Sequence, residues 1–278
     1  MNGTIAVALD LLRESISRRW FLALGAAITL VLVFLGLALR LDVVDGALAA
    51  TRLFGTALDN DIRSVDVALR PMFEAAADAI FYGGLAFGVL ACADFGPSLL
   101  APGRIEHLLA LPVRRHELLA GTYLGVLLLA CAGALYGAGG LALILGAKTG
   151  VWTLRPLAAA LLAAVTFAAI YGAMLAAAVF ARSSALSAAV GAALFVCGIV
   201  AGYRDELLAA FEPGVGREAF AGITLALPRV SALARTAADI AASRPVDLAV
   251  VAAMLAGVFA FGFAMLALAV WRFEGRDF

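Results

Sequence analysis

The chain has 278 residues, of which 64% are hydrophobic and 14% are charged, and its formal net charge at pH 7 is zero. Soluble domains are about half apolar and about a quarter charged, so this composition indicates an integral membrane protein. A net charge of zero provides no basic surface of the kind that nucleic acids require, and we expect no nucleic-acid partner.

The first segment, residues 1–19, has the pattern of an amphipathic helix. Polar side chains recur at positions 10, 13, 14, 17 and 18, which follow one helical face. The opposite face carries Ile5, Leu9, Leu12 and Ile16. A helix of this kind directly before an apolar run is expected to lie in the membrane interface.

Six apolar runs follow, each near or above the ~20 residues that a helix needs to cross a bilayer. They cover approximately residues 20–39, 76–93, 118–147, 156–181, 186–203 and 246–271. Because backbone polar groups must be satisfied inside the bilayer, helices are the expected conformation. We predict an all-α, polytopic membrane protein with six transmembrane helices, in which residues 1–278 form one transmembrane domain.

An even number of crossings places both termini and the connection 94–117 on one side of the membrane. The positive-inside rule predicts that this side is cytoplasmic, because its arginines lie close to the span ends. These arginines are Arg13, Arg18, Arg19, Arg104, Arg114, Arg115, Arg182, Arg272 and Arg276. Residues 40–75 and 204–245 are then extracytoplasmic loops. Apolar spacing within 42–75 and 223–242 predicts short helices there, which lie on the outer membrane face, cap a pathway or form a solvated cap.

The apolar runs contain essentially no ionisable side chains, since Asp78 and Asp247 lie at the ends of theirs. Ion-coupled transport and catalysis within the bilayer need such groups at membrane depth. The three cysteines, Cys92, Cys131 and Cys197, form no ligand cluster and are interpreted as small buried hydrophobes. We expect no catalytic residue, no metal site, no cofactor and no enzymatic activity in this chain. It has no phosphate-binding loop motif, so any ATP-driven work would need another polypeptide.

Glycines spaced four residues apart occur three times. This spacing lets helix backbones approach closely, either within the chain, which is the commoner case, or between two copies. The predicted packing positions are Gly84, Gly88, Gly121, Gly125, Gly133 and Gly137.

The stretch 103–125, GRIEHLLALPVRRHELLAGTYLG, concentrates charge between two apolar runs. Ile105, Leu108 and Leu109 share one helical face, and Pro112 then interrupts the helix. The charged positions around them are Arg104, Glu106, His107, Arg114 and Arg115. A short amphipathic helix, a kink and a charged collar suit insertion into a groove of a cytoplasmic partner. An ordinary helix bound to lipid headgroups is the alternative.

This stretch resembles a known family. The pattern P-S-L-L-x-x-G-x-I-E-x-L-L-x-x-P-V-x-R-x-E-L-x-x-G, at residues 97–121, is similar to the loop between the second and third spans of ABC type-2 exporter permeases. The ending WRFEGRDF, at residues 271–278, is similar to the family's tail. Thr122, where the family often has Lys, and the long loop 40–75 depart from the pattern, which leaves subfamily and substrate open.

The resemblance implies the transmembrane permease subunit of an ABC transporter, in the inner (plasma) membrane of a prokaryote, with both termini cytoplasmic. Two permease chains, identical or related, would pair, and two copies of a separate ATPase subunit would hold ATP and Mg²⁺. In the coupling loop 94–117, the five charged positions named above would contact the ATPase, and the three apolar positions would fill its cleft. An amphipathic or apolar substrate would be exported.

Two alternatives stay open. One is the permease of an ABC machine for extracytoplasmic assembly, such as metalloenzyme maturation or surface-structure biogenesis. Its outer loops contain no Cys or His, and Met72 is their only methionine, so direct copper handling lacks ligands. The other is a non-transporting membrane scaffold whose loop recruits a partner.

Overall fold

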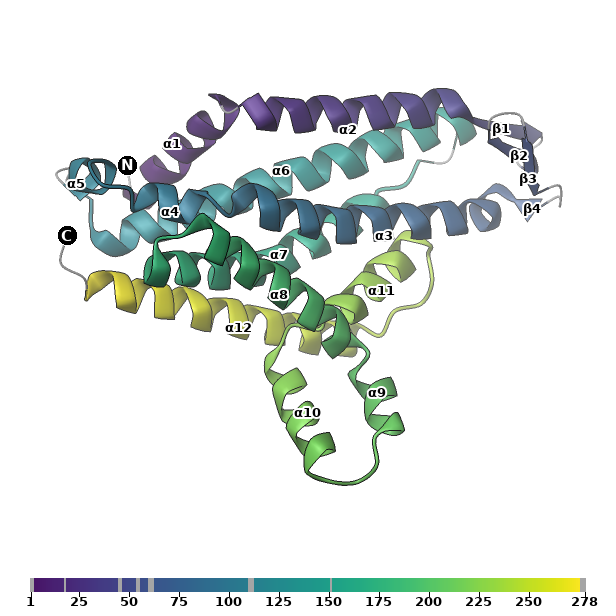
Figure 1. Ribbon diagram of the computed structural model, residues 1–278. Helices are drawn as coiled ribbons and strands as arrows, with labels where there is room; N and C mark the ends of the chain where they lie inside the picture. Colours follow the sequence, from purple (N-terminus) through teal and green to yellow (C-terminus); the bar gives the residue numbers. More distant parts are fainter. Residues whose placement is uncertain are drawn as a thin grey trace.

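The computed structural model describes residues 3–17, 19–44, 47–53, 56–59, 63–109, 113–150 and 152–275. The six predicted apolar runs are all helical in it (Figure 1). The corresponding helices are α2 (Arg19–Ala38), α3 (Val65–Cys92), α6 (Arg115–Thr149), α7 (Arg155–Ala181), α8 (Ser184–Gly202) and α12 (Leu248–Glu274).

Five segments of the described chain are helical, long and apolar enough to cross a membrane. They are Arg70–Leu99, which continues α3 into the short helix α4 (Phe95–Leu99), and the whole of α6, α7, α8 and α12. The chain is therefore a polytopic α-helical membrane protein.

Helix α7 is the centre of the bundle. In the most apolar 18-residue stretch of α7, 83% of the residues are buried inside the protein, whereas in the corresponding stretch of α12 only 11% are buried. Many of its residues are alanine, and small side chains allow α3, α6, α8, α11 and α12 to pack against it. The two helices approach closely at Gly172, where an added Cβ would lie 3.0 Å from the carbonyl oxygen of Gly262 in α12. Helix α12 instead exposes most of its surface, as a lipid-facing helix would.

The segment between α2 and α3 differs from the prediction. Instead of helices, most of it forms a four-stranded antiparallel sheet, and only its last part, from Val65, belongs to helix α3. The strands are β1 (Leu39–Val44), β2 (Ala47–Leu53), β3 (Thr56–Asp59) and β4 (Arg63–Ser64), with β2 paired to the other three.

The helix prediction was wrong there because the apolar residues at the start of the segment recur at every second position, not at the three- to four-residue spacing of a helix. Leu39, Leu41 and Val43 alternate with polar residues, which is the period of a strand. Val44 pairs with Ala47 across a two-residue connection whose sequence is Asp-Gly, the strongest short-range signal for a hairpin.

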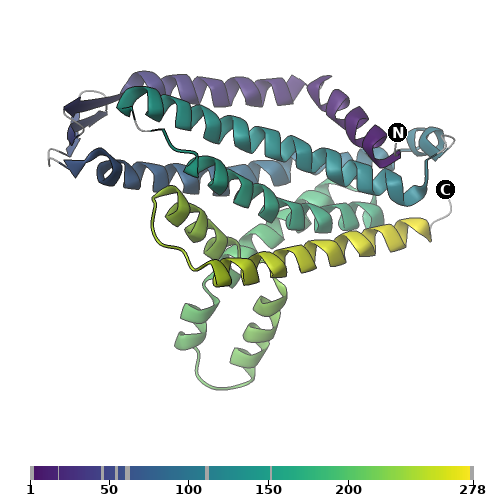
Figure 2. The ribbon, with the colours of Figure 1, turned by 180° about the vertical axis from the view of Figure 1, so that it is seen from behind.

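The helix predicted within residues 223–242 of the last long loop is confirmed, and two helices that were not predicted begin before this stretch. Helices α9 (Arg204–Ala210) and α10 (Val215–Ala226) form a hairpin that projects sideways from the bundle (Figures 1 and 2). Helix α11 (Val230–Ala241) packs between α3, α7 and α8, and Leu233 and Ala237 are fully buried. Helix α11 is thus part of the core and does not lie on the outer membrane face.

Candidate functional site

One end of the bundle gathers segments that are distant in the sequence. Helix α1 (Gly3–Ser17), α4, helix α5 (Arg104–Leu109), the beginning of α6 and the end of α12 all lie there, and the sheet lies at the opposite end (Figures 1 and 2). The two ends of the described chain therefore share the side of the bundle on which α5 lies. We call this set of segments the α5 end.

Helix α5 is fixed to the bundle through its apolar face. Gly103 precedes it with a φ of 81°, a left-handed conformation that glycine adopts without strain and that turns the chain between α4 and α5. Ile105 is 4% exposed and packs in a cluster with Leu99, Leu119 and Leu175. Ile105 is thus a core residue of this chain, contrary to the expectation that it fills the cleft of a partner, because α5 turns this side chain towards α4, α6 and α7.

The guanidinium of Arg104 is held by Glu14 of α1. It donates two hydrogen bonds, from Nη1 to Oε1 at 3.1 Å and from Nη2 to Oε2 at 2.6 Å. The hydrogen bonds to Glu14 raise the pKa of Arg104 above its ordinary value, so the guanidinium stays protonated. The pair lines a cavity of about 220 Å³ between α1, α4, α5 and α6. Arg104 therefore ties α5 to α1, in a planar two-bond geometry that a lysine would not reproduce.

A second link joins the beginning of α6 to the end of α12. Nη1 of Arg115 donates a hydrogen bond to the backbone carbonyl of Glu274 at 3.2 Å. Nδ1 of His116 lies 3.3 Å from the Glu274 carboxylate. The backbone N–H of Arg114 donates to Oε2 of Glu117 at 2.9 Å, which caps the first turn of α6. Arg115 and Glu117 therefore both make hydrogen bonds to other residues of this chain.

The other predicted residues divide into exposed, packed and undescribed ones. Glu106 and Arg114 are exposed at the α5 end. Leu108 is partly buried against the cluster that contains Ile105. His107 and Leu109 contribute their backbone to α5, and their side chains lie outside what the structure describes, as does Pro112 altogether.

Helix α1 crosses α6 at the predicted glycine pair Gly121 and Gly125. A Cβ on Gly121 would lie 2.7 Å from the carbonyl oxygen of Thr4, and a Cβ on Gly125 would lie 3.1 Å from that of Ala8. Only glycine permits this approach of the two backbones. The predicted apolar face of α1 points away from α6, since the exposed fractions of Ile5 and Ile16 are 45% and 68%.

The remaining predicted glycines have two different environments. Gly88 packs against Phe167, whose ring would lie 2.8 Å from an added Cβ. Around Gly84, Gly133 and Gly137, an added Cβ would meet nothing within 4 Å. These three glycines line an elongated cavity of about 620 Å³ between α2, α3, α6 and α7.

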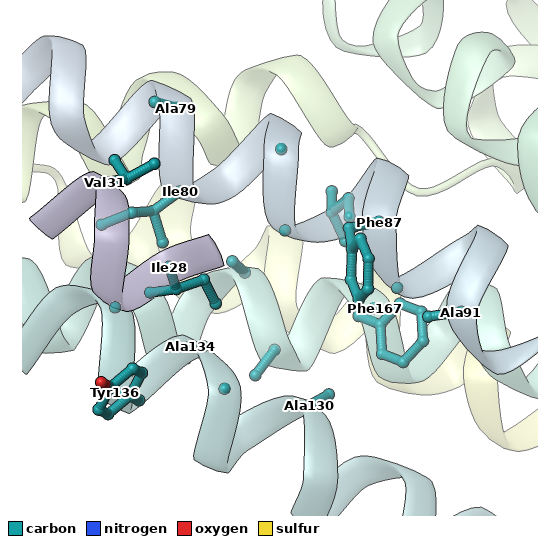
Figure 3. Close-up of a pocket in the computed structure, with 18 of the residues that line it drawn as sticks. Ile28, Val31, Ala79, Ile80, Phe87, Ala91, Ala130, Ala134, Tyr136 and Phe167 are labelled. Atoms are coloured by element: carbon teal, nitrogen blue, oxygen red, sulfur yellow. The ribbon is translucent and has the colours of Figure 1, made fainter. Parts of the chain in front are cut away.

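The cavity is apolar along its whole length (Figure 3). Phe87 and Phe167 lie together at one end, and Val31 and Ile80 lie at the other. The lining includes no charged residue. The hydroxyl of Tyr136 is its main polar group, and it shares a hydrogen bond of 2.6 Å with Thr29 Oγ1, which fastens α2 to α6.

Within the described part of the chain, no three His, Cys, Asp or Glu side chains are grouped so that they could hold a metal ion. No family model matches the sequence, and no curated protein is significantly similar to it. The geometry of the α5 end and of the cavity therefore carries the functional argument.

Sequence reasoning missed the partners that hold the α5 end together. Glu14 and Glu274 stand in the sequence as unremarkable acidic residues next to apolar runs. From the sequence, each of these glutamates indicates only a polar environment. Their pairing with Arg104 and His116 depends on contacts between residues that lie 90 or more positions apart in the chain. The close approach of Gly172 to Gly262 was also missed, although Ala169 and Ala173 give α7 the same spacing of small residues.

Proposed function

We propose that this chain is the permease subunit of an ATP-driven exporter, which receives a separate ATPase at its α5 end. In this proposal α2 is a sixth crossing, α1 lies in the cytoplasmic interface, and the sheet and the α9–α10 hairpin are extracytoplasmic. The observation that carries the proposal is the junction at Arg104. An exposed charged helix outside the spans is joined by two hydrogen bonds to α1, and α1 is packed backbone to backbone on α6.

This construction supports transmission of movement. A partner that displaced α5 would also displace α1 through the Arg104–Glu14 pair and α6 through the contact at Gly121. Helix α1 runs into α2, and α6 packs along α7, so the displacement would reach the bundle through packed helices. Packed elements move as rigid bodies, and this is the kind of coupling that drives alternating access.

The distribution of charge supports the assignment of sides. Arg104, Arg114 and Arg115 all belong to the α5 end, close to the first turns of α6. Basic residues that flank spans are retained in the cytoplasm, where an ATPase has access to them. The exposed face of α1, with Ile5 and Ile16, then lies against the cytoplasmic leaflet.

Co-purification tests the proposed partner. The full chain is expressed together with an ABC ATPase subunit from the same organism and isolated in mild detergent. Glu106→Lys reverses an exposed charge on α5 and is expected to abolish recovery of the ATPase. Glu212→Lys, an equally exposed change between α9 and α10, is the matched control and should leave recovery unchanged. Equal recovery with both variants would contradict the proposal.

A second variant tests the apolar side of α5. Leu108→Asp combined with Leu109→Asp is expected to abolish ATPase association while the protein still inserts into the membrane. Because Leu108 is partly buried, membrane insertion and thermal unfolding are measured in parallel. Unchanged association in a folded double variant would count against an apolar contact at this helix.

ATP hydrolysis separates transport from recruitment alone. A permease that transmits movement is expected to stimulate the ATPase. Glu14→Gln should reduce this stimulation while binding persists, because it weakens the link between α5 and α1 without changing a residue that is expected to contact the ATPase. A scaffold that only recruits the ATPase would show no stimulation in the unaltered protein.

A further inference from the structure

Two helices of the bundle end together at the α5 end, and each has an arginine there. Helices α7 and α12 run in the same direction (Figures 1 and 2), and side chains from their last turns share one apolar cluster. Their close contact joins Gly172 to Gly262. Arg182 follows the first of these glycines by ten residues, and Arg272 follows the second by ten. Because the rise per residue is the same in both helices, the two arginines lie at about the same depth.

That depth corresponds to the surface of the bilayer. Helix α12 has no charged side chain between Asp247 and Arg272, and at 1.5 Å per residue this stretch is about 36 Å long. The hydrocarbon core is about 30 Å thick, so both ends of the stretch reach the headgroups. Trp271 is 69% exposed, and tryptophan is enriched at this level of a membrane. This placement depends only on α7 and α12, which are both long and apolar enough to cross a membrane.

The guanidinium of Arg272 is oriented by an aromatic ring. Its Cζ lies 5.6 Å from the centroid of the Phe180 ring, which is a cation–π contact. Among the described residues no carboxylate pairs with Arg272, and its buried Nε–H has no hydrogen-bond acceptor. The carboxylate of Glu274, two residues further on, lies 3.3 Å from His116 instead. The described chain therefore holds this positive charge at headgroup level without neutralising it.

The position of Arg182 is fixed by its backbone. Arg182 ends α7 with a φ of 52°, a left-handed conformation in which glycine is the usual residue. Its N–H donates to the carbonyl oxygen of Ala178 at 2.8 Å, and the residue is exposed. A left-handed conformation costs any residue with a Cβ some conformational energy, and such strain is concentrated at functional sites. The exposed side chain is the feature of Arg182 that glycine would not supply.

The chemistry of this surface favours a phosphate that carries acyl chains. A guanidinium presents its donors in a planar fork that matches the oxygens of a phosphate. Towards the membrane interior, Leu268 and Phe263 of α12 are exposed, and they offer an apolar surface beside the arginines. Two positive charges favour a lipid with a net negative charge, since the choline of a zwitterionic lipid adds a positive charge next to its phosphate.

We propose that Arg182 and Arg272 bind the headgroup phosphate of one anionic phospholipid, whose acyl chains lie along α12. Phe180 holds the guanidinium of Arg272 in place, and Trp271 lies at the level of the lipid glycerol. A carboxylate of a partner protein would satisfy the arginines but would leave the apolar surface of α12 unused. The lipid binds whether or not an ATPase docks on α5, so the site does not depend on the function proposed above.

Native mass spectrometry of the full chain in detergent tests this site, with phosphatidylglycerol and phosphatidylcholine added at equal concentrations. The unaltered protein is expected to bind one phosphatidylglycerol per chain in preference to phosphatidylcholine. Arg272→Gln should weaken this binding about fivefold, which is the contribution of one basic residue at a membrane surface. Arg155→Gln is the matched control, because Arg155 flanks α7 at its other end, and it should leave binding unchanged. Equal binding of the two lipids, or an equal loss in both variants, would overturn the proposal.

A second variant separates lipid binding from folding. Arg182→Gly removes a guanidinium and also relieves the left-handed strain, so the Tm in detergent should stay close to that of the unaltered protein. Binding of phosphatidylglycerol is nevertheless expected to weaken about fivefold. Unchanged binding in this variant would overturn the proposal.

Two further measurements identify the source of the anion. An excess of inorganic phosphate, at constant ionic strength, should not displace phosphatidylglycerol, because it gains nothing from the apolar surface. Displacement would mean that the site takes a soluble anion. Arg272→Gln should also leave recovery of the ATPase unchanged in co-purification. Loss of the ATPase with unchanged lipid binding would mean that the arginines serve a protein partner, and either result would overturn the proposal.

Discussion

Helix α6 carries two glycine pairs of the same spacing, and the structure uses them in opposite ways. At Gly121 and Gly125 the backbone of α1 fills the space that the missing side chains leave. At Gly133 and Gly137 nothing fills it, and the cavity begins there. The spacing of small residues thus indicates where a helix backbone is accessible, but it does not indicate what lies against it.

The difference follows from helical geometry. The second pair begins twelve residues after the first, which at about 100° per residue turns it by about 120° around the helix axis. The first pair therefore faces α1 and the second faces the gap between α2 and α3. A pattern that repeats along a sequence need not repeat on one face of a helix.

The largest effect that would test this comparison is expected from Gly121→Leu. The added side chain would meet the backbone oxygen of Thr4 at 2.7 Å, so α1 must move away from α6. We expect a loss of about 3 kcal/mol or more in stability, at the upper end of overpacking effects, and a clear fall in Tm in detergent. A variant with the Tm of the unaltered protein would show that α1 does not pack at Gly121.

A smaller effect is expected from the ion pair that holds α5 to the other face of α1. In a double-mutant cycle of Glu14→Gln and Arg104→Gln, we expect a coupling free energy of about 0.5–1 kcal/mol, because both side chains are partly exposed. The coupling should shrink as the salt concentration rises. Additive effects of the two substitutions would mean that the pair does not join α5 to α1.

A still smaller effect is expected from the corresponding ion pair elsewhere in the molecule. Arg244 donates hydrogen bonds to both oxygens of Glu74, at 2.7 and 3.2 Å, and one to Asp239. Solvent screens this cluster more strongly than Arg104, so Arg244→Gln should lower Tm by less than Arg104→Gln does. The two Tm values, measured in the same detergent and salt, decide this order.

The smallest effect is expected from Gly133→Leu. The new side chain enters open space, and we expect a change in unfolding free energy within about 0.5 kcal/mol. The comparison with Gly121→Leu is sharpest when both are measured by the same thermal assay. A destabilisation as large as that of Gly121→Leu would mean that the cavity is filled by protein.

The long helices of the bundle were predictable from the sequence, because a single apolar run that crosses a membrane can satisfy its backbone polar groups only as a helix. The sheet after α2 was missed because helical spacing was sought in a segment where Leu39, Leu41 and Val43 alternate. At the α5 end, a short helix was predicted within residues 103–111 from its amphipathic pattern, and it is confirmed over Arg104–Leu109. Which of its faces is buried could not be predicted, since Ile105 is equally apolar whether it meets this chain or a partner.

The most direct test of the account concerns the location of α5. In a chain whose three native cysteines are replaced, Glu106→Cys places one thiol at the α5 end, and Asp59→Cys places one in β3 at the opposite end. With a membrane-impermeant maleimide added to intact cells, the account predicts labelling at 59 and none at 106. It also predicts that a cross-linker on the thiol at 106 captures the ATPase. Labelling at 106 from outside, or capture of lipid alone, would contradict it.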